Sequence, residues 1–377
     1  MDTPTVAVAT LATQYKRNLF HKIDAIFDLF EMEKRIPRRG FAAVKLHFGE
    51  EGNTTFVRPI FLRRIVENLK AIGARPFLTD TCTLYVGERS NAVEHLELAE
   101  RHGFVPPVVN APVLIADGLR GNSYKEIPVR GKHVETAFVA KEIAEADAVI
   151  GVTHFKAHEL SGIGGTLKNI GMGCAARKGK LAQHSNVAPK VKRKRCVGCK
   201  TCVAVCAFHA IAMVDGKAQI DSEKCAGCGE CITACPQKAI QIQWNETIPV
   251  FQEKLAEYAR AALMGKEKTS LFFNFVWEIS AICDCNPHSG APIAPGIGIV
   301  ASTDPVAVDQ AAVDLICSPP EEIREALHLP YTTLDNPFEK VYPKSDWTIH
   351  LRHAEKISLG RRRYTLVNVD PLPDPGH

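Results

Sequence analysis

Eight of the thirteen cysteines in this 377-residue chain lie in one short window, at spacings that suit metal binding by sulfur. They form two runs with the same pattern, C-x2-C-x2-C-x3-C: Cys196, Cys199, Cys202 and Cys206, then Cys225, Cys228, Cys231 and Cys235. The second run follows the first at an offset of 29 residues, and Ala210-Ile211 recurs as Ala239-Ile240 at the same offset. The window is therefore an internal duplication.

This spacing is typical of ligands for [4Fe-4S] clusters. Three thiolates on a tight loop each bind one iron of a cubane, and the fourth cysteine of each run reaches the other cluster. We therefore predict two [4Fe-4S] clusters with crossed ligand sets. The first set is Cys196, Cys199, Cys202 and Cys235, and the second is Cys225, Cys228, Cys231 and Cys206. A pair of zinc sites is the alternative, but zinc ligand pairs are usually separated by a longer spacer.

The duplicated window resembles a known electron-transfer domain. Residues 190–243 are similar to the bacterial two-[4Fe-4S] ferredoxin, which has a small α+β fold. Ala207 departs from that family, in which a proline usually follows the fourth cysteine, but the change removes no ligand. Between the two runs, Ala210–Val214 and Ala218–Ile220 flank Asp215-Gly216, which predicts a hairpin with a two-residue turn.

Outside this window, short apolar stretches alternate with helical patterns. The predicted strands are Val6–Leu11, Ala42–Phe48, Arg75–Thr79, Val113–Ala116, Ala148–Thr153 and Ile297–Ala301. The alternation is typical of an α/β fold, a mainly parallel sheet with helices on both faces. Neither flank is long enough for the whole sheet, so we predict one discontinuous α/β domain, residues 1–188 and 245–370, interrupted by the ferredoxin-like domain, residues 189–244. Residues 371–377 are predicted to be a flexible tail.

Four polar side chains that follow predicted strands are candidate catalytic residues. Asp80 follows the predicted strand Arg75–Thr79. His154, Lys156 and His158 follow the predicted strand Ala148–Thr153. Ligands of doubly wound sheets bind beyond the carboxyl ends of the strands, so we expect these side chains to converge. One of the two histidines is a candidate metal ligand or general acid/base, and the alternative is that both are hydrogen-bonded structural residues. The two would share a helix face, although nearby glycines also permit a loop.

The remaining cysteines suggest a third metal centre. On an extended segment Cys283 and Cys285 point to the same side, so both thiolates can face one site. With Cys174 and His47 they form the predicted ligand set, because imidazole and thiolate suit iron, zinc, copper or nickel. The alternative is that these cysteines pack as small apolar side chains. Cys82 is a further candidate ligand or redox thiol.

A glycine-rich turn and two aspartates give a weaker signal. The turn Gly162–Lys168 lacks the full Walker pattern, but its backbone N–H groups could hold an anion or a carboxylate. The alternative is a flexible turn before a helix. Asp304 is predicted to cap a helix that Pro305 opens, and Asp309 to be a structural or substrate-orienting carboxylate.

The flanks as a whole resemble the family called domain of unknown function 362. The segments that carry the resemblance are Lys45–Glu50, Thr79–Tyr85, His154–His158, Gly164–Asn169, Gly171–Cys174, Cys283–Cys285 and Ala301–Asp309. The resemblance covers most of the chain, and many proteins of the family carry a ferredoxin insert at this point. It implies an iron–sulfur redox protein but does not imply a particular reaction.

The amino-acid composition excludes several classes of protein. Apolar residues make up 46% and charged residues 23%, which excludes a disordered chain, a collagen-like fibre and a coiled coil. The formal charge of +4 is too small to predict nucleic-acid binding. No apolar stretch reaches the roughly 18 residues of a membrane span, and the N-terminus lacks the pattern of a signal peptide. We therefore expect a cytoplasmic protein without a membrane partner, whose thiols stay reduced.

Together these patterns predict an iron–sulfur oxidoreductase that works under anaerobic conditions. The two clusters would exchange electrons with an external low-potential electron donor or acceptor. They would pass the electrons to an unknown small-molecule substrate or to the third metal site in the α/β domain. The alternative is a non-catalytic electron carrier or a metal- or cluster-delivery factor. The basic run Lys190–Arg195 is either a solvated linker, which we favour, or a docking site for an acidic redox partner.

Overall fold

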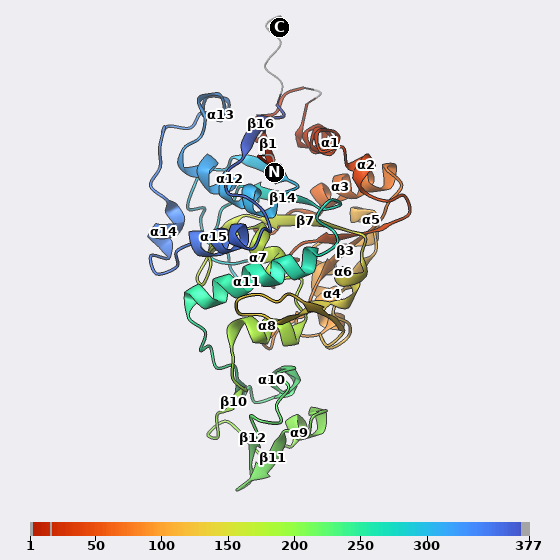
Figure 1. Ribbon diagram of the computed structural model, residues 1–377, viewed down its shortest axis with the longest axis vertical. Coiled ribbons are helices and arrows are strands. Elements are labelled where there is room, and N and C mark those ends of the chain that lie inside the picture. Colours follow the sequence, from red (N-terminus) through yellow and green to blue (C-terminus); the bar gives the residue numbers. More distant parts are fainter. Residues whose placement is uncertain (1–2, 16, 371–377) are drawn as a thin grey trace, which may run out of the picture.

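A large mixed sheet forms the centre of the molecule in the computed structural model, which describes residues 3–15 and 17–370 (Figure 1). Its strand order is β16-β1-β15-β14-β7-β2-β3-β4. The strands are β1 Thr5–Thr10, β2 Phe41–Lys45, β3 Arg75–Asp80, β4 Val113–Ile115, β7 Ala148–His154, β14 Leu271–Val276, β15 Gly298–Ser302 and β16 Thr365–Asn368. Neighbours pair in parallel except for β15, which is antiparallel to β1 and β14. The prediction of a mainly parallel α/β sheet is confirmed.

The sequence located six of these strands and missed two. The central strand β14 is buried along its whole length, and a short apolar run without alternation does not distinguish a strand from a helix. The strand β16 lies at the sheet edge and pairs only with β1, so its residues are only partly buried. Both missed strands thus lack the period-two pattern that identifies a strand with one buried face.

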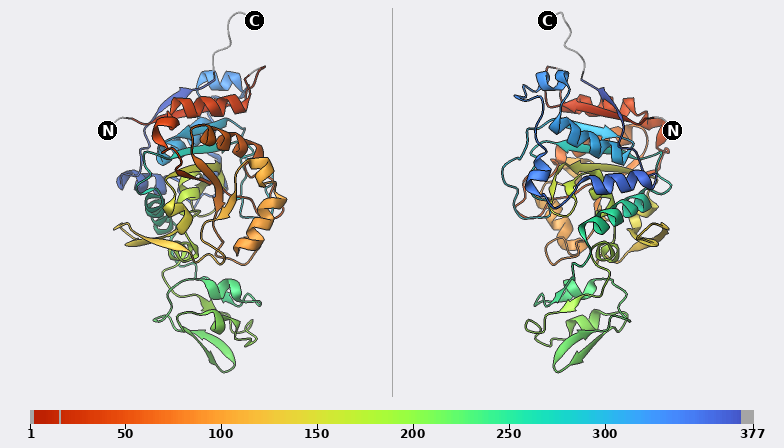
Figure 2. Two further views of the ribbon diagram at one scale, coloured as in Figure 1. Left: turned by 90° about the vertical axis from the view of Figure 1, so that its right-hand side faces the viewer. Right: turned by 60° about the vertical axis from the view of Figure 1, so that its left-hand side comes forward.

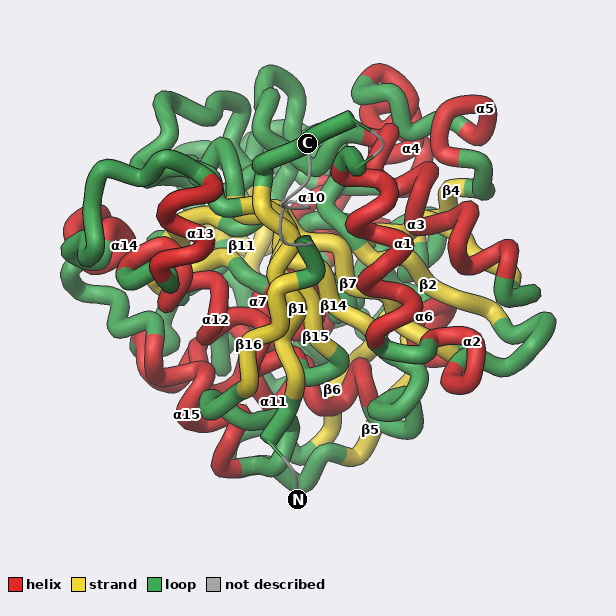
Figure 3. The backbone as a smooth tube through the Cα atoms, turned by 90° about the horizontal axis from the view of Figure 1, so that it is seen from above, coloured by secondary structure: helices red, strands yellow, loops and turns green. Residues whose placement is uncertain are grey.

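Helices cover both faces of the sheet, because successive strand residues point to opposite sides. In β7, Ile150 packs on the side of α1 (Leu19–Leu29), α3 (Pro59–Ala71) and α4 (Ala92–Arg101). Val149 packs on the other side, with α7 (Thr166–Gly171), α11 (Ile248–Leu263), α12 (Pro305–Cys317) and α15 (Thr348–Lys356). Figure 3 shows α1 and α3 on one side of the strands and α12 and α15 on the other.

Shorter elements complete the body. The short helices are α2 Met32–Arg35, α5 Pro106–Val109, α6 Lys141–Glu145, α8 Arg177–His184, α13 Glu321–Ala326 and α14 Pro337–Val341. Two hairpins lie outside the main sheet: β5 Tyr124–Pro128 with β6 Thr136–Ala140, and β8 Lys156–His158 with β9 Gly162–Gly164. No helix in the described part of the chain combines the length and the apolar character needed to cross a membrane.

The cysteine-rich window forms a separate lobe that projects from the body below α8 (Figures 1 and 2). Its elements are β10 Lys190–Val191, α9 Thr201–Val205, β11 Ile211–Val214, β12 Lys217–Ile220, α10 Glu230–Ala234 and β13 Ile240–Gln241. The pairing of β10 with β13 brings the entry and exit of the lobe together in one neck. The predicted hairpin is present as β11 and β12, and both turn residues, Asp215 and Gly216, have the positive φ that such a turn requires.

The domain limits proposed from the sequence, residues 189–244 within 1–188 and 245–370, remain predictions. A contact across the neck lies at those limits, because the Gln243 side-chain amide donates to the Ala188 carbonyl at 2.7 Å. The tail predicted over 371–377 lies outside the described residues.

Candidate functional site

A cavity of about 520 Å³ opens at the carboxyl ends of β2, β3 and β7. This is the edge of the sheet at which doubly wound α/β folds bind their ligands. The cavity is rich in charged and titratable groups, which include Lys45, His47, Asp80, Arg89, His154, Lys156, His158, Lys168, Lys180 and His184. All four candidate catalytic residues therefore line one cavity, together with candidate metal ligands His47 and Cys285.

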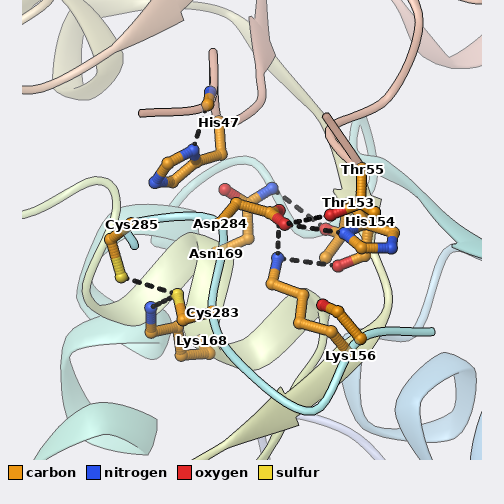
Figure 4. Close-up of polar contacts among 12 residues, drawn as sticks. His47, Thr55, Thr153, His154, Lys156, Lys168, Asn169, Cys283, Asp284 and Cys285 are labelled. Atoms are coloured by element: carbon orange, nitrogen blue, oxygen red, sulfur yellow. Dashed lines mark hydrogen bonds and ion pairs between the residues drawn. The ribbon is translucent and has the colours of Figure 1, made fainter. Parts of the chain in front are cut away.

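The loop that follows β14 brings Cys283 and Cys285 to this cavity (Figure 4). Their sulfur atoms lie on the same side of the loop, 2.7 Å apart, as expected for residues i and i+2 of an extended segment. Cys283 is buried, and Cys285 is partly exposed and lines the cavity. The two thiols are thus neighbours, and one of them is reachable from the cavity.

Asp284, between the two cysteines, points the other way and fixes the loop (Figure 4). One carboxylate oxygen lies 2.8 Å from His154 Nδ1, and the other lies 2.9 Å from Lys156 Nζ. Burial alone would raise the pKa of Asp284, but the charges of His154 and Lys156 lower it below its usual range. Two of the candidate catalytic side chains therefore hold the cysteine loop in place.

The segment from His154 to His158 is not helical. His154 ends β7, and Lys156–His158 forms β8, so the two histidines do not share a helix face. His154 turns its two ring nitrogens toward Asp284 and the Glu278 carbonyl. The physical reason is that β8 pairs with β9, which the glycines of that strand allow to approach closely.

Cys283 faces a cation and an imidazole. Lys168 Nζ lies 3.3 Å from its sulfur, and His158 interacts with the same sulfur. A hydrogen bond from Cys285 lowers the pKa of the Cys283 thiol, and Lys168 adds to this against the opposing effect of burial. The same hydrogen bond raises the pKa of Cys285. The pair therefore concentrates negative charge on Cys283.

The tautomer of His158 follows from its backbone contacts. Its Nδ1 accepts hydrogen bonds from the N–H groups of Leu160 and Ser161, each at 3.2 Å. A nitrogen that accepts two N–H groups carries no proton, so the proton of the neutral ring is on Nε2. Burial, followed by the charge of Lys168, lowers the pKa of His158, which favours this neutral form.

A second ion pair lies at the ends of β2 and β3. Lys45 Nζ is 3.0 Å from Asp80 and 2.9 Å from the Asn169 side-chain oxygen, and the Lys45 and Asp80 side chains are nearly inaccessible. Burial would raise the pKa of Asp80, but the Lys45 ammonium lowers it below its usual range. Asp80 is consequently held as a carboxylate and is suited to orienting cations rather than to exchanging protons.

His47 lies beside a buried arginine. Arg89 is 2.9 Å from His47 Nε2, and it also binds Glu50 at 3.1 Å and the Tyr85 hydroxyl. Burial, followed by the charge of Arg89, lowers the pKa of His47 well below its usual value. His47 is thus a neutral imidazole in the cavity wall.

The wall nearest the lobe is apolar and aromatic. Its side chains are Leu84, Leu160, Met172, Trp244, Ile248 and Phe251. The His184 ring stacks on Phe251 at 4.8 Å between centroids and meets the edge of Trp244 at 4.5 Å. The cavity therefore has a charged end at the strands and an apolar end toward the neck of the lobe.

The glycine-rich turn before α7 is occupied by a side chain of the protein itself. The N–H groups of Thr166 and Leu167 donate to the two Asp309 carboxylate oxygens at 2.7 and 2.9 Å. The Asn274 amide donates to the same carboxylate at 2.7 Å, and burial raises the pKa of Asp309 to about 6. Of the predicted alternatives, the turn holds a carboxylate, and Asp309 is structural. Asp304 caps α12 through the N–H groups of Val306 and Ala307, as predicted.

The other cysteines named from the sequence lie in the core. Cys174 and Cys82 are fully buried among apolar side chains, and burial raises the pKa of Cys174 to about 11. Neither lines the cavity that Cys285 lines. Within residues 3–15 and 17–370, no three His, Cys, Asp or Glu side chains form a group that could hold one metal ion. The third centre built from Cys283, Cys285, Cys174 and His47 therefore stays a prediction.

The eight cysteines of the lobe gather as two groups of four. One small cavity is lined by Cys196, Cys199, Cys202 and Cys235, and a second is lined by Cys206, Cys225, Cys228 and Cys231. These are the two crossed sets derived from the spacing. Backbone N–H groups point at several of the sulfurs: Ala218 at Cys196, Ala210 at Cys206 and Ala239 at Cys235, at 3.3 to 3.4 Å.

The second group of four lies against the body of the protein. A Cβ atom at Gly229, next to Cys228, would lie 3.1 Å from the Leu84 side chain, which also lines the large cavity. The neighbouring Glu230 binds Arg120 at 3.3 Å and Asn122 at 3.2 Å. Figure 1 shows α10 facing the body, with α9 and the β11–β12 hairpin farther away. One group of thiols is therefore proximal to the cavity and the other is distal.

Comparison with known proteins identifies the family. No curated protein matches the chain. A solved structure, the lactate racemase apoprotein from Thermoanaerobacterium thermosaccharolyticum, is similar at 12% identity with a TM-score of 0.40. The similarity covers 83% of this chain and 58% of that one, so the chain spans little more than half of that structure's length. The model of one family matches residues 42–314, most of the chain. The chain belongs to that family, which is described as Domain of unknown function (DUF362).

Proposed function

We propose that the protein is an iron–sulfur oxidoreductase. Its lobe is a ferredoxin-like domain that binds two [4Fe-4S] clusters, and its substrate binds in the cavity at the carboxyl ends of the strands. The observation that carries the proposal is the arrangement of the lobe cysteines in two groups of four, one of which lies next to a wall residue of the cavity, Leu84. This arrangement gives electrons a short route from the lobe to the cavity.

The residues of the lobe fit such clusters. Each small cavity presents four thiols, which is the ligand number of a [4Fe-4S] cubane, and they come from both runs as the spacing requires. Gly198, Gly227 and Gly229 have positive φ, which lets the backbone fold closely around the sulfurs. When bound, the clusters would supply one-electron transfer.

The side chains of the cavity then bind and orient the substrate. Lys168 and the buried Lys180 place two ammonium groups on the cavity wall, and Asp80 remains a carboxylate. His154 and Lys156 hold the cysteine loop through Asp284, and neutral His158 carries its proton on Nε2, because its Nδ1 accepts from the Leu160 and Ser161 N–H groups. In this proposal Asp80, His154 and Lys156 act mainly by positioning the substrate and the cysteine loop. His158 is the group best placed to move a proton.

An external low-potential donor or acceptor would exchange electrons with the distal group of thiols. Cys199 is exposed, and Val197 beside it is 63% exposed, so this end of the lobe is open to a partner. The route would then run from the distal group to the proximal group and on toward Leu84.

Dispersed polar groups and a pocket with only apolar walls would favour the alternative, a carrier or delivery factor. Instead, His154, Lys156 and the Cys283–Cys285 loop meet around Asp284. Convergent polar groups in a cavity favour catalysis at that place. We therefore favour an enzyme over a carrier or delivery factor.

The test is anaerobic reconstitution of the full chain with iron and sulfide. We expect about eight iron and about eight labile sulfide atoms per chain and, after reduction with dithionite, the electron paramagnetic resonance signals of reduced cubanes. Colourless protein without labile sulfide, or protein that takes up only zinc, would overturn the proposal. Iron clearly above eight per chain that disappears in Cys283→Ser and Cys285→Ser would instead support the predicted third centre.

A further inference from the structure

We propose that Cys283 and Cys285 form a redox-active dithiol that closes to a disulfide on the wall of the cavity. The proposal deepens the proposed function, because it names the group that stores two electrons beside the substrate. The sulfurs are 2.7 Å apart, whereas a disulfide bond is about 2.05 Å long. A small movement of two side chains therefore closes the bond.

The loop is held so that this movement stays local. Asp284 is paired with His154 and Lys156 on the side of the loop away from the sulfurs, and its side chain is 1% exposed. The Thr55 hydroxyl lies 3.4 Å from the same carboxylate. The backbone of the loop thus stays in place while the thiols on its other side react.

The groups around Cys283 suit sulfur chemistry better than metal binding. Lys168 places an ammonium group 3.3 Å from the sulfur, where it stabilises a thiolate and repels a metal cation. His158 cannot readily act as a ligand, since its Nδ1 is taken by two backbone N–H groups and its Nε2 carries the proton. A dithiol therefore fits these neighbours, whereas a third metal centre has to displace them.

Oxidation by an organic disulfide illustrates the balance of the step. The pair begins with one proton between its two sulfurs. The proton first moves from Cys285 to Cys283, and the Cys285 thiolate, which faces the cavity, attacks the reagent, so that a mixed disulfide forms and one reagent sulfur leaves as a thiolate that takes the proton from Cys283. The Cys283 thiolate then attacks the Cys285 sulfur and releases the second reagent sulfur as a thiolate. Two electrons have passed to the reagent, and two one-electron donors used in succession would reverse the oxidation.

The experiment measures the thiols directly. The holoprotein is equilibrated anaerobically with mixtures of reduced and oxidised dithiothreitol, quenched in acid and alkylated after denaturation. Mass spectrometry of the peptide that contains Cys283 and Cys285 then counts its alkyl groups. We expect two groups in the reduced mixture and none in the oxidised mixture, with a single two-electron transition between them.

Matched variants make the outcome specific. In Cys283→Ser and in Cys285→Ser the remaining cysteine should be alkylated in every mixture, whereas Cys317→Ser should leave the transition unchanged. Iron per chain should equal that of the wild type in all three variants. Two alkyl groups on the wild-type peptide in every mixture would overturn the dithiol, and so would wild-type iron clearly above eight per chain that falls to about eight in the loop variants. Either result leaves the lobe clusters intact, so it is distinct from failure of the proposed function.

Discussion

The two cysteine-rich regions of the molecule differ in what surrounds their sulfur atoms. In the lobe, eight cysteines stand in two groups of four around small cavities, and backbone N–H groups point at sulfurs such as those of Cys206 and Cys235. In the loop after β14, two cysteines touch each other, and one of them faces the ammonium group of Lys168.

The difference shows how one residue type is directed to two kinds of chemistry. Backbone dipoles stabilise a thiolate only partly, which leaves its charge available to a cationic iron core. A fixed ammonium neutralises the thiolate by itself and competes with a metal ion. We therefore expect the lobe sulfurs to bind inorganic clusters and the loop sulfurs to react with each other.

The largest expected effect concerns the crossed ligand sets of the lobe. Cys206→Ser and Cys228→Ser should each lose about half of the iron, and the double variant should lose no more, because both residues serve one cluster. Combining Cys206→Ser with Cys199→Ser should remove nearly all of it, since each cluster then lacks a ligand. Iron and sulfide analysis of anaerobically reconstituted protein decides the matter. If the second pair retained half of the iron, the sets would not be crossed.

The next effect separates loop anchoring from cluster binding. Asp284→Ala leaves Lys156 and His154 buried without their partner, which should lower the free energy of unfolding by about 3–5 kcal/mol. Urea denaturation followed by circular dichroism measures the change, and iron per chain should remain that of the wild type.

An exposed ion pair near the same loop provides the control. Glu278→Gln removes the charge that pairs with Arg58, and both side chains are well exposed, so we expect a change of about 0–1 kcal/mol. Equal destabilisation by Glu278→Gln and Asp284→Ala would argue against a special role of Asp284 in fixing the loop.

The two groups of lobe cysteines could be predicted from the sequence, but the role of Asp284 in fixing the loop could not. The lobe cysteines are near neighbours along the chain, so their spacing alone predicts both groups of four. The partner of Asp284, His154, is 130 residues away, and the partner of the Gly162–Lys168 turn, Asp309, is about as far from it. No local pattern reports such pairs. One signal was available: if Cys283 and Cys285 share one side of an extended loop, Asp284 must point to the other side.

A smaller effect depends on pH and separates the body from the lobe. His95 and His350 are fully buried in the body, and burial lowers the pKa of each to about 3. Above pH 6.5 these rings are neutral in both states, so the full stability is present. As the pH falls below 6.5, the two histidines bind protons in the unfolded chain but stay neutral in the folded body. The free energy of unfolding therefore decreases by about 1.4 kcal/mol per pH unit for each histidine.

Urea denaturation of the body at pH 7.5, 6.5 and 5.5, about one pH unit apart, measures this loss. His95→Leu should reduce the slope between the two lower values by at most about 1.4 kcal/mol per pH unit, since one buried ring no longer titrates. The one histidine of the lobe, His209, is exposed, so hydrogen exchange in residues 210–220 should not follow the same dependence. A slope that is unchanged by His95→Leu would assign the acid sensitivity to other groups.

The smallest expected effect lies at the contact between the lobe and the body. Glu230→Gln weakens the pairing with Arg120, whose side chain is 63% exposed, and keeps an oxygen that Asn122 can still reach. The free energy of unfolding should therefore change by less than about 1 kcal/mol, and iron per chain should not change. Hydrogen exchange over residues 225–235 should become faster while exchange in β7 stays constant, because only the docking of the proximal group is loosened. A loss of iron in this variant would mean that the cysteine spacing alone does not assemble the proximal site and that contact with the body is also needed. The two cysteine-rich regions would then be coupled rather than independent.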